Sequence, residues 1–325
     1  MEFIITIDTE ADNQWDHGRE LTVENLKYVP RFQELCNNYG IKPTYLVTSE
    51  VCEDTFAKKI FEDYVDKDWA EIGSHLHSWT TPPFQDKVGY MYNDRHHAFA
   101  TELSIDLLTE KIKTLTGQIE NAFGKRPLSF RSGRFGYNEM LGKILMENNY
   151  IVDSSVTPYV NWKRNKGIPE GEGGPDFINC TPFPYTYTFT NGSLLEIPVT
   201  ILPTKFPFTR SHSLSRYHFR NVNGNIILKA LRKIFFYDQP VWFRPYLSTS
   251  INVLEALINE ASRIKLPYLV MMFHSSELMP GCSKYRPDKS SIEMLYSLLE
   301  QLFKSLQKRE IRSVSLTEAA LENKI

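Results

Sequence analysis

The chain opens with the stretch FIITIDTEAD at residues 3–12, an apolar and β-branched run that ends in three carboxylates, Asp8, Glu10 and Asp12. A short apolar run of this composition favours a buried strand. Ionised side chains are seldom buried unless they have partners or a function. The end of this first strand is therefore a candidate site.

Three later runs end in the same way. Apolar residues lead to His75 in EIGSH at 71–75, to Arg131 in LSFR at 128–131, and to His274 in LVMMFH at 269–274. In parallel α/β folds the loops that follow the carboxyl ends of the strands meet on one face, where the chemistry is located. We therefore expect Asp8, His75, Arg131 and His274 to lie on one face.

Strands and helices alternate along the rest of the chain. Apolar spacing predicts helices over 23–39, 53–65, 106–123, 138–148, 224–236, 250–264 and 290–308, and strands over 44–48, 71–74, 128–131, 150–153, 195–200, 268–273 and 311–316. This alternation implies parallel strands joined by right-handed crossovers. A Gly/Pro-rich stretch at 167–175 interrupts the pattern. We expect a single domain over 1–325, a closed or partly open barrel with an insertion at about 157–195.

Composition excludes several classes of protein. A length of 325 residues suits one (β/α) barrel, and a net charge of −2 offers no basic field for nucleic acid. No run approaches the roughly 18 apolar residues of a membrane span, and no signal core precedes the first strand. The four scattered cysteines indicate neither a disulfide framework nor a thiolate metal site. We expect a cytoplasmic protein, and the oligomeric state stays unknown.

The histidines suggest a metal site. His75 and His77 are two residues apart, and two imidazoles with a carboxylate make a common three-ligand set of a catalytic zinc-like site. The pair by itself is also compatible with ordinary hydrogen-bonded histidines. The carboxylates Asp8 and Glu10 can reach the same place or merely cap the following segment.

The other two polar strand ends allow two interpretations each. Arg131 can hold a carboxylate ionised and oriented through a bidentate contact, or it can form a structural salt bridge. His274 ends the most apolar run and is either a satisfied core group or a general acid.

Taken together, five motifs resemble those of the NodB-homology polysaccharide deacetylases, carbohydrate esterase family 4. They are TIDTE at 6–10, EIGSH at 71–75, FRSG at 130–133, VDSSV at 152–156 and MFHS at 272–275. The resemblance covers nearly the whole chain. It is closest to a divergent branch with HLHSW at 75–79, Pro82-Pro83 and a late WFRP at 242–245. It implies a distorted (β/α)7 barrel and metal-dependent hydrolysis of an N-acyl group from an amino sugar.

The resemblance also implies roles for single residues. The family's catalytic base corresponds to Asp8, its first histidine ligand to His75, its base-orienting arginine to Arg131 and its acid histidine to His274.

Two positions depart from the family pattern. Thr9 stands where the family has a metal-binding aspartate, and Trp79 stands where it has the second histidine ligand. Glu10 and His77 are the substitutes. The implied cofactor is one divalent ion, zinc, with manganese, cobalt and nickel as alternatives. Because of these two substitutions, three interpretations stay open: the metal has an altered coordination geometry, the metal site is weaker, or the metal has been lost.

The expected substrate is a soluble amino-sugar precursor of a surface polysaccharide, nucleotide-linked or lipid-linked, that carries an acetyl or formyl group. The segment Phe206–Tyr217, with Arg210, His212 and Arg216, and His218 just after it, can supply a lid with charge for a phosphate, or it is a solvated loop. Two alternatives to the deacylase stay open. One is an O-acyl esterase that uses the same site, and the other is a carbohydrate-binding pseudoenzyme that has lost the metal.

Overall fold

The computed structural model describes residues 1–14, 20–85, 87–88, 91–92, 97–166, 173–204, 209, 226–227 and 240–322. The expected lid segment and the expected helix at 224–236 lie almost entirely outside these residues. Most of the Gly/Pro-rich stretch lies outside them as well.

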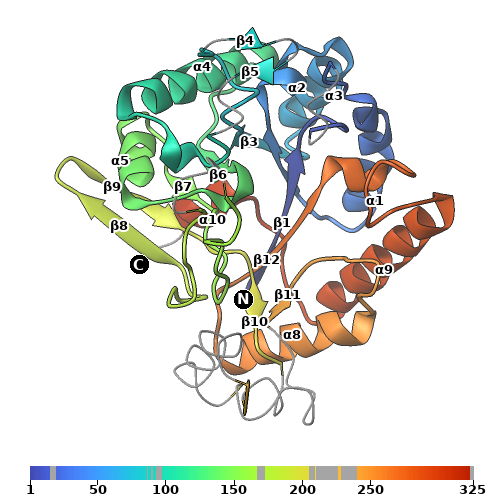
Figure 1. Cartoon of the computed structure of the whole chain (residues 1–325). Coiled ribbons are helices and arrows are strands. Elements are labelled where there is room, and N and C mark those ends of the chain that lie inside the picture. The colour runs from blue at the N-terminus through green and yellow to red at the C-terminus, as the bar shows by residue number, and fades with distance from the viewer. Residues whose placement is uncertain are drawn as a thin grey trace.

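A curled sheet of eight strands lies at the centre of the described chain (Figure 1). Its order is β12-β1-β2-β3-β6-β7-β9-β8. The strands are β1 Glu2–Thr9, β2 Thr44–Val47, β3 Glu71–Leu76, β6 Ser129–Ser132, β7 Val152–Asp153, β8 Tyr185–Phe189, β9 Gly192–Glu196 and β12 Tyr268–His274. All neighbours pair in parallel except β8, which forms an antiparallel hairpin with β9. The seven parallel strands confirm the expected distorted (β/α)7 barrel.

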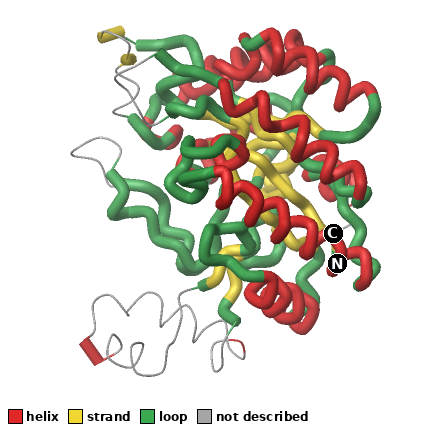
Figure 2. Tube along the Cα trace, turned by 90° about the vertical axis from the view of Figure 1, so that its right-hand side faces the viewer, coloured by secondary structure: helices red, strands yellow, loops and turns green. Residues whose placement is uncertain are grey.

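Amphipathic helices surround this sheet, as the two views in Figures 1 and 2 show. They are α1 Val29–Asn38, α2 Ser49–Glu53, α3 Thr55–Asp66, α4 Ile105–Phe123, α5 Glu139–Glu147, α8 Ile251–Arg263, α9 Lys289–Lys308 and α10 Leu316–Glu322. Their apolar faces and the apolar side chains of the strands form one large buried cluster. No helix among the described residues is long and apolar enough to cross a membrane.

The barrel is closed by two hydrogen bonds instead of a full ladder. After β9 the chain passes the outer edge of β12, where the Thr200 N–H donates to the Val270 carbonyl (3.1 Å). The Val270 N–H in turn donates to Thr200 Oγ1 (2.8 Å). The chain then forms β10 (Ile201–Leu202), which pairs antiparallel with β11 (Val241–Trp242). A short strand pair, β4 (Lys87–Val88) and β5 (Met91–Tyr92), lies outside the barrel.

Two expected strands differ in the structure. The strand expected over 195–200 is shifted, since β9 ends at Glu196. The strand expected over 311–316 is wrong: only one bridge joins Phe3 to Ser313, and α10 begins at Leu316. The reason is a capping box, in which the Glu318 N–H donates to Ser315 Oγ while the Ser315 N–H donates to the Glu318 carboxylate.

The strand register brings the polar strand ends together. Asp8 on β1 is level with His274 on β12, and His75 on β3 is level with Arg131 on β6. All four belong to neighbouring or nearly neighbouring strands of a strongly curled sheet. The prediction that they share one face is confirmed.

Candidate active site

Asp8 and Arg131 form a buried ion pair at the base of the site. Arg131 Nη1 donates to Asp8 Oδ1 (2.7 Å) and to Thr6 Oγ1 (2.8 Å), while its Nε and Nη2 donate to the two oxygens of Ser154 (2.7 and 3.0 Å). The contact uses one carboxylate oxygen and is not bidentate. Burial by itself would raise the pKa of Asp8, but the Arg131 charge, with help from His75, holds that pKa below its usual value. Asp8 is therefore ionised and oriented.

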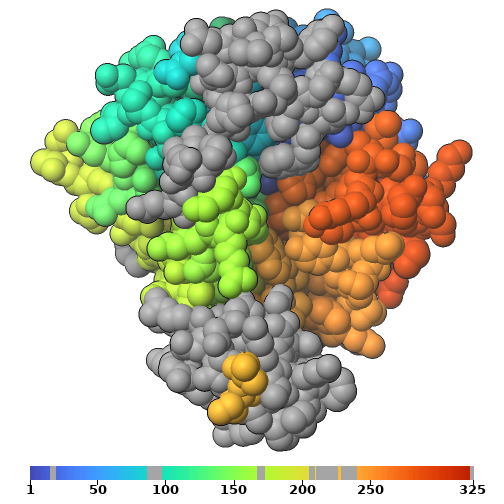
Figure 3. Space-filling view, viewed as in Figure 1, coloured from blue at the N-terminus to red at the C-terminus, as the bar shows by residue number. Residues whose placement is uncertain are grey.

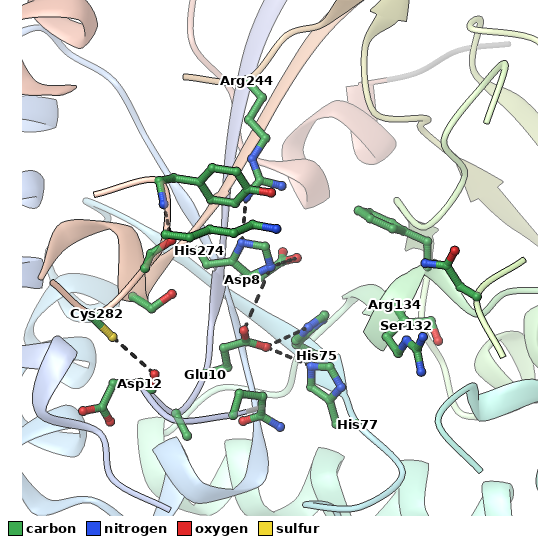
Figure 4. A pocket seen from close by; sticks show the side chains of 18 of the residues that line it. Asp8, Glu10, Asp12, His75, His77, Ser132, Arg134, Arg244, His274 and Cys282 are labelled. Carbon is green, nitrogen blue, oxygen red and sulfur yellow. Dashed lines mark hydrogen bonds and ion pairs between the residues drawn. The ribbon is translucent and has the colours of Figure 1, made fainter. Parts of the chain in front are cut away.

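Glu10 lies beside both predicted histidine ligands. Its Oε2 is 2.8 Å from His77 Nε2 and 3.7 Å from His75 Nε2 (Figure 4). All three side chains are buried, and one ligand atom from each lies within 4.8 Å of the others. Burial would raise the pKa of Glu10, but its contacts with His75 and His77 lower it. The carboxylate is thus held in its ionised form.

The orientation of His75 suits a metal ion. Its Nδ1 lies 2.9 Å from the Arg131 backbone carbonyl, and because a carbonyl can only accept, Nδ1 carries the hydrogen. The lone pair of Nε2 then points toward Glu10. Metal-binding histidines commonly have their second nitrogen fixed in this way. One carboxylate and two imidazoles also match the ligand preference of zinc, with room left for further ligands. The residues present fit a divalent ion.

His274 completes the group from β12, the strand next to β1. Its Nε2 lies 4.0 Å from Asp8 Oδ2 and 4.0 Å from Glu10 Oε1. About a quarter of its side chain is exposed (26%), whereas Asp8 and Glu10 are almost fully buried (3% each). His274 is therefore the member of this group with most access to a ligand. The structure brings all six sequence-predicted site residues together: Asp8, Glu10, His75, His77, Arg131 and His274.

All of these side chains except Arg131 line a pocket of about 550 Å³, a volume typical of small-ligand sites. The pocket is also lined by the aromatic residues Phe99, Phe135 and Trp162 and by Lys284 and Tyr285. In Figure 3 the green surface of the loop after β7 and the orange surface of the C-terminal third lie on either side of the front face. Both regions supply lining residues.

Trp79 explains one departure from the family pattern. Its ring packs against the His77 imidazole, with ring centroids 4.4 Å apart. Its indole N–H donates to the side-chain oxygen of Gln14 (3.0 Å), whose amide donates to Glu50 (2.8 Å). Trp79 therefore supports His77 and occupies no ligand position.

Sequence reasoning missed three contributors to the pocket. Arg244 was visible only as part of the WFRP motif, although its guanidinium lies within 3.0 Å of His274. Phe135 and Trp162 stack with an interplanar angle of 22° and a centroid distance of 5.5 Å. These two rings lie in different loops, and no periodic pattern could have paired them.

Comparison with known proteins supports the fold. No known family profile and no curated protein matches the sequence. Among solved structures, a candidate polysaccharide deacetylase from Mycobacterium smegmatis is similar, with 13% identity and a TM-score of 0.51 over 95% of this chain and 92% of that one. A 4-α-glucanotransferase from Thermococcus litoralis is also similar, with 13% identity and a TM-score of 0.55. That likeness covers this whole chain (100%) but only 41% of the other chain.

Identities this low establish the fold and no activity, and these two structures are named for different activities. The strand order, the parallel register and the likeness over nearly the whole chain agree with the motifs. The chain therefore has the polysaccharide-deacetylase fold that its motifs predicted.

Proposed function

We propose that the protein is a metal-dependent hydrolase that removes an acetyl or formyl group from the nitrogen of an amino sugar, a precursor of a surface polysaccharide. The observation that carries this proposal is the juxtaposition of two sets in one pocket: Glu10, His75 and His77, which fit a divalent ion, and Asp8 with His274. The fold likeness to a candidate polysaccharide deacetylase supports the same conclusion.

Glu10, His75 and His77 would hold the ion, for which zinc suits the ligand set best. Such an ion supplies Lewis acidity, which polarises an acyl carbonyl and makes a water molecule more acidic. Manganese, cobalt and nickel are the alternative ions. The three ligands themselves contribute a single negative charge from Glu10, so the ion's charge is only partly neutralised.

Side chains of the protein itself transfer the protons in the proposed reaction. Asp8 Oδ1 is engaged by Arg131, which leaves Oδ2, on the side of His274, to accept a proton from the attacking water. Breaking the C–N bond then requires a proton on the departing amine. Asp8, once it has taken a proton, and His274 both lie where they can act at this stage.

The pocket wall suits a sugar ring. Phe135 and Trp162 are half-buried and stacked beside the polar group, and flat apolar faces of this kind pack well against the C–H face of a pyranose. Arg134 and Lys284 also line the pocket, and their charges suit a nucleotide- or lipid-linked phosphate.

The test combines metal content with turnover. We expect about one equivalent of zinc in the purified protein, loss of that zinc in His75→Ala, and release of acetate or formate from N-acyl sugar nucleotides only by the metal-loaded wild type. His97→Ala is the matched control, because His97 lies outside the pocket lining.

Other results would redirect the proposal. No zinc, manganese, cobalt or nickel bound even after loading would rule out the metal mechanism. Release from O-acyl sugars alone would indicate an esterase. Sugar binding without any hydrolysis would indicate a carbohydrate-binding pseudoenzyme.

A further inference from the structure

Arg244 is a buried arginine with one unusual neighbour. Only 5% of the residue is exposed, and its Nη2 lies 2.6 Å from Glu277 Oε1 and 3.0 Å from His274 Nδ1. Its Nη1 lies 3.0 Å from the sulfur of Met272. Figure 4 shows Arg244 reaching down beside His274, on the side away from His75 and His77. A histidine in an active site more often has a carboxylate or a carbonyl at this nitrogen.

The chemistry of the guanidinium decides which nitrogen of His274 carries hydrogen. An arginine has five N–H donors, no acceptor, and stays protonated in proteins. A hydrogen bond between Arg244 and Nδ1 therefore requires a lone pair on Nδ1. In a neutral imidazole the hydrogen must then be on Nε2.

Glu277 is the competing neighbour, since its carboxylate would prefer a hydrogen on Nδ1. Its Oε1 is farther from Nδ1, at 3.4 Å. That oxygen already accepts from Arg244 and from the His274 backbone N–H (3.1 Å). The carboxylate is thus satisfied by other donors, and the shorter contact to Nδ1 belongs to Arg244.

The hydrogen on Nε2 points into the pocket, toward Asp8 Oδ2 and Glu10 Oε1. We propose, on the basis of the proposed function, that Arg244 is a positioning residue that holds His274 as the neutral Nε2–H tautomer, so that His274 acts as a hydrogen-bond donor and Asp8 carries the proton to the departing amine.

The proton balance closes without His274 changing charge. Water forms the C–O bond while one of its protons passes to Asp8 Oδ2. The C–N bond then breaks with its electron pair on nitrogen, and the same proton passes from Asp8 to that nitrogen. His274 donates a hydrogen bond throughout, as a neutral imidazole can. This differs from the acid role that the resemblance implied for His274.

The direct test is nitrogen-15 NMR of the histidine side chains in the full chain, at a pH of about 8, where an ordinary imidazole is neutral. His274→Gln assigns the signal. In the wild type we expect Nδ1 without hydrogen and Nε2 with it. In Arg244→Met, Glu277 remains as the partner of Nδ1, and we expect the tautomer to reverse. Arg244→Lys, which also only donates, should keep the wild-type tautomer.

Arg286→Met is the matched control. Arg286 is equally buried (1% exposed), but its guanidinium donates to the backbone oxygens of Tyr285 and Pro245. Its loss should leave the His274 tautomer unchanged. The double variant Arg244→Met/Glu277→Met removes both charges at once and so avoids an unpaired buried carboxylate. It should show a mixture of the two tautomers.

A wild-type signal with hydrogen on Nδ1, or an unchanged tautomer in Arg244→Met, would overturn the inference.

A kinetic measurement tests the same inference. Arg244→Met should lower kcat by about 100-fold or more with little change in KM, since a wrong histidine tautomer costs about this much or more in other enzymes. Arg244→Lys should recover most of the loss.

The two proposals can fail separately, because the NMR measurement needs no substrate. The expected tautomer without hydrolysis of any N-acyl sugar would overturn the proposed function and with it the role in the reaction. Hydrolysis together with the opposite tautomer would overturn only the inference about Arg244.

Discussion

At the scale of single residues, the position of His77 depends on Gly133, which packs directly against its ring. A Cβ added at Gly133 would lie 2.5 Å from His77 Nδ1 and 2.6 Å from the Leu76 carbonyl oxygen. The Leu76 oxygen is a backbone atom and can move only with the strand end that carries His77, and Nδ1 can move only if the His77 ring turns. We expect Gly133→Ala to weaken zinc binding about 10- to 100-fold, as loss of the groups that support a metal ligand does. Isothermal titration with zinc measures this effect.

Gly117→Ala on α4 is the matched control for Gly133→Ala. Nothing lies within 4 Å of a Cβ added there. Replacing a glycine inside a helix by alanine should raise the free energy of unfolding by about 0.5–1 kcal/mol and leave zinc binding unchanged. Equal zinc affinity in Gly133→Ala and the wild type would show that His77 is not a zinc ligand, or that the loop around it makes room for the added methyl group without displacing the ring.

At the scale of elements, α4 holds the loop that follows His77. The buried Lys111 ammonium donates to three backbone carbonyls, those of Ser78 (3.0 Å), Thr81 (2.6 Å) and Pro83 (2.7 Å). Lys111→Met would leave these oxygens without a charged donor. We expect a loss of about 2–4 kcal/mol in the free energy of unfolding, measured by urea denaturation.

Lys113, on the same helix, offers the comparison for Lys111. It is exposed and pairs with Glu110, three residues earlier, in a surface contact that contributes little to stability. Lys113→Met should change the free energy of unfolding by less than about 0.5 kcal/mol. Similar losses in both variants would mean that the three carbonyl contacts of Lys111 add nothing specific.

The pairing of β7 with β9 places two buried carboxyl groups, Asp153 and Glu196, level with each other. Burial raises the pKa of Glu196 well above its usual value, and the Asp153 charge raises it further. The folded protein thus holds this proton more tightly than the unfolded chain does. The resulting stability is present below the unfolded pKa of 4.5 and is lost as the pH rises toward the folded pKa.

We expect Glu196→Gln to remove most of this pH dependence, because the amide cannot ionise. As the pH rises above 4.5, the free energy of unfolding should fall with a smaller slope in the variant than in the wild type. Urea denaturation at several pH values checks this, with the exposed Glu293→Gln as control. Parallel curves for wild type and Glu196→Gln would contradict a raised pKa of Glu196 in the folded protein.

At the scale of the whole molecule, the barrel is closed where Thr200 meets Val270. Thr200→Val keeps the shape of the side chain but removes the oxygen that accepts the buried Val270 N–H. We expect a loss of about 1–3 kcal/mol in the free energy of unfolding, the cost of leaving such a group without its acceptor. Thr188→Val on the exposed side of β8 should cost almost nothing. A Thr200→Val variant as stable as the wild type would show that the closure is not held by this bond.

Local patterns of apolar residues in the sequence predicted most of the barrel strands. The β-branched run of β1 and the apolar run of β12 could be recognised because their side chains are buried on both faces of a parallel sheet. The 311–316 segment was misassigned since a capping box at Ser315 and Glu318 outweighed its β-like composition. The short β7 and the shifted β9 were only approximate, because pairing across the sheet sets where such strands end.

The sequence by itself determined the alternation of strands and helices, and with it the barrel, because helical and strand periodicities are local properties of the chain. It also determined which strand ends carry Asp8, Glu10, His75, His77, Arg131 and His274, since polar residues after apolar runs are visible in one dimension. Only the tertiary structure decided that Trp79 supports His77, that Phe135 stacks on Trp162, and that Arg244 contacts His274. These contacts join loops far apart in the chain, and their geometry depends on how the curled sheet brings those loops together.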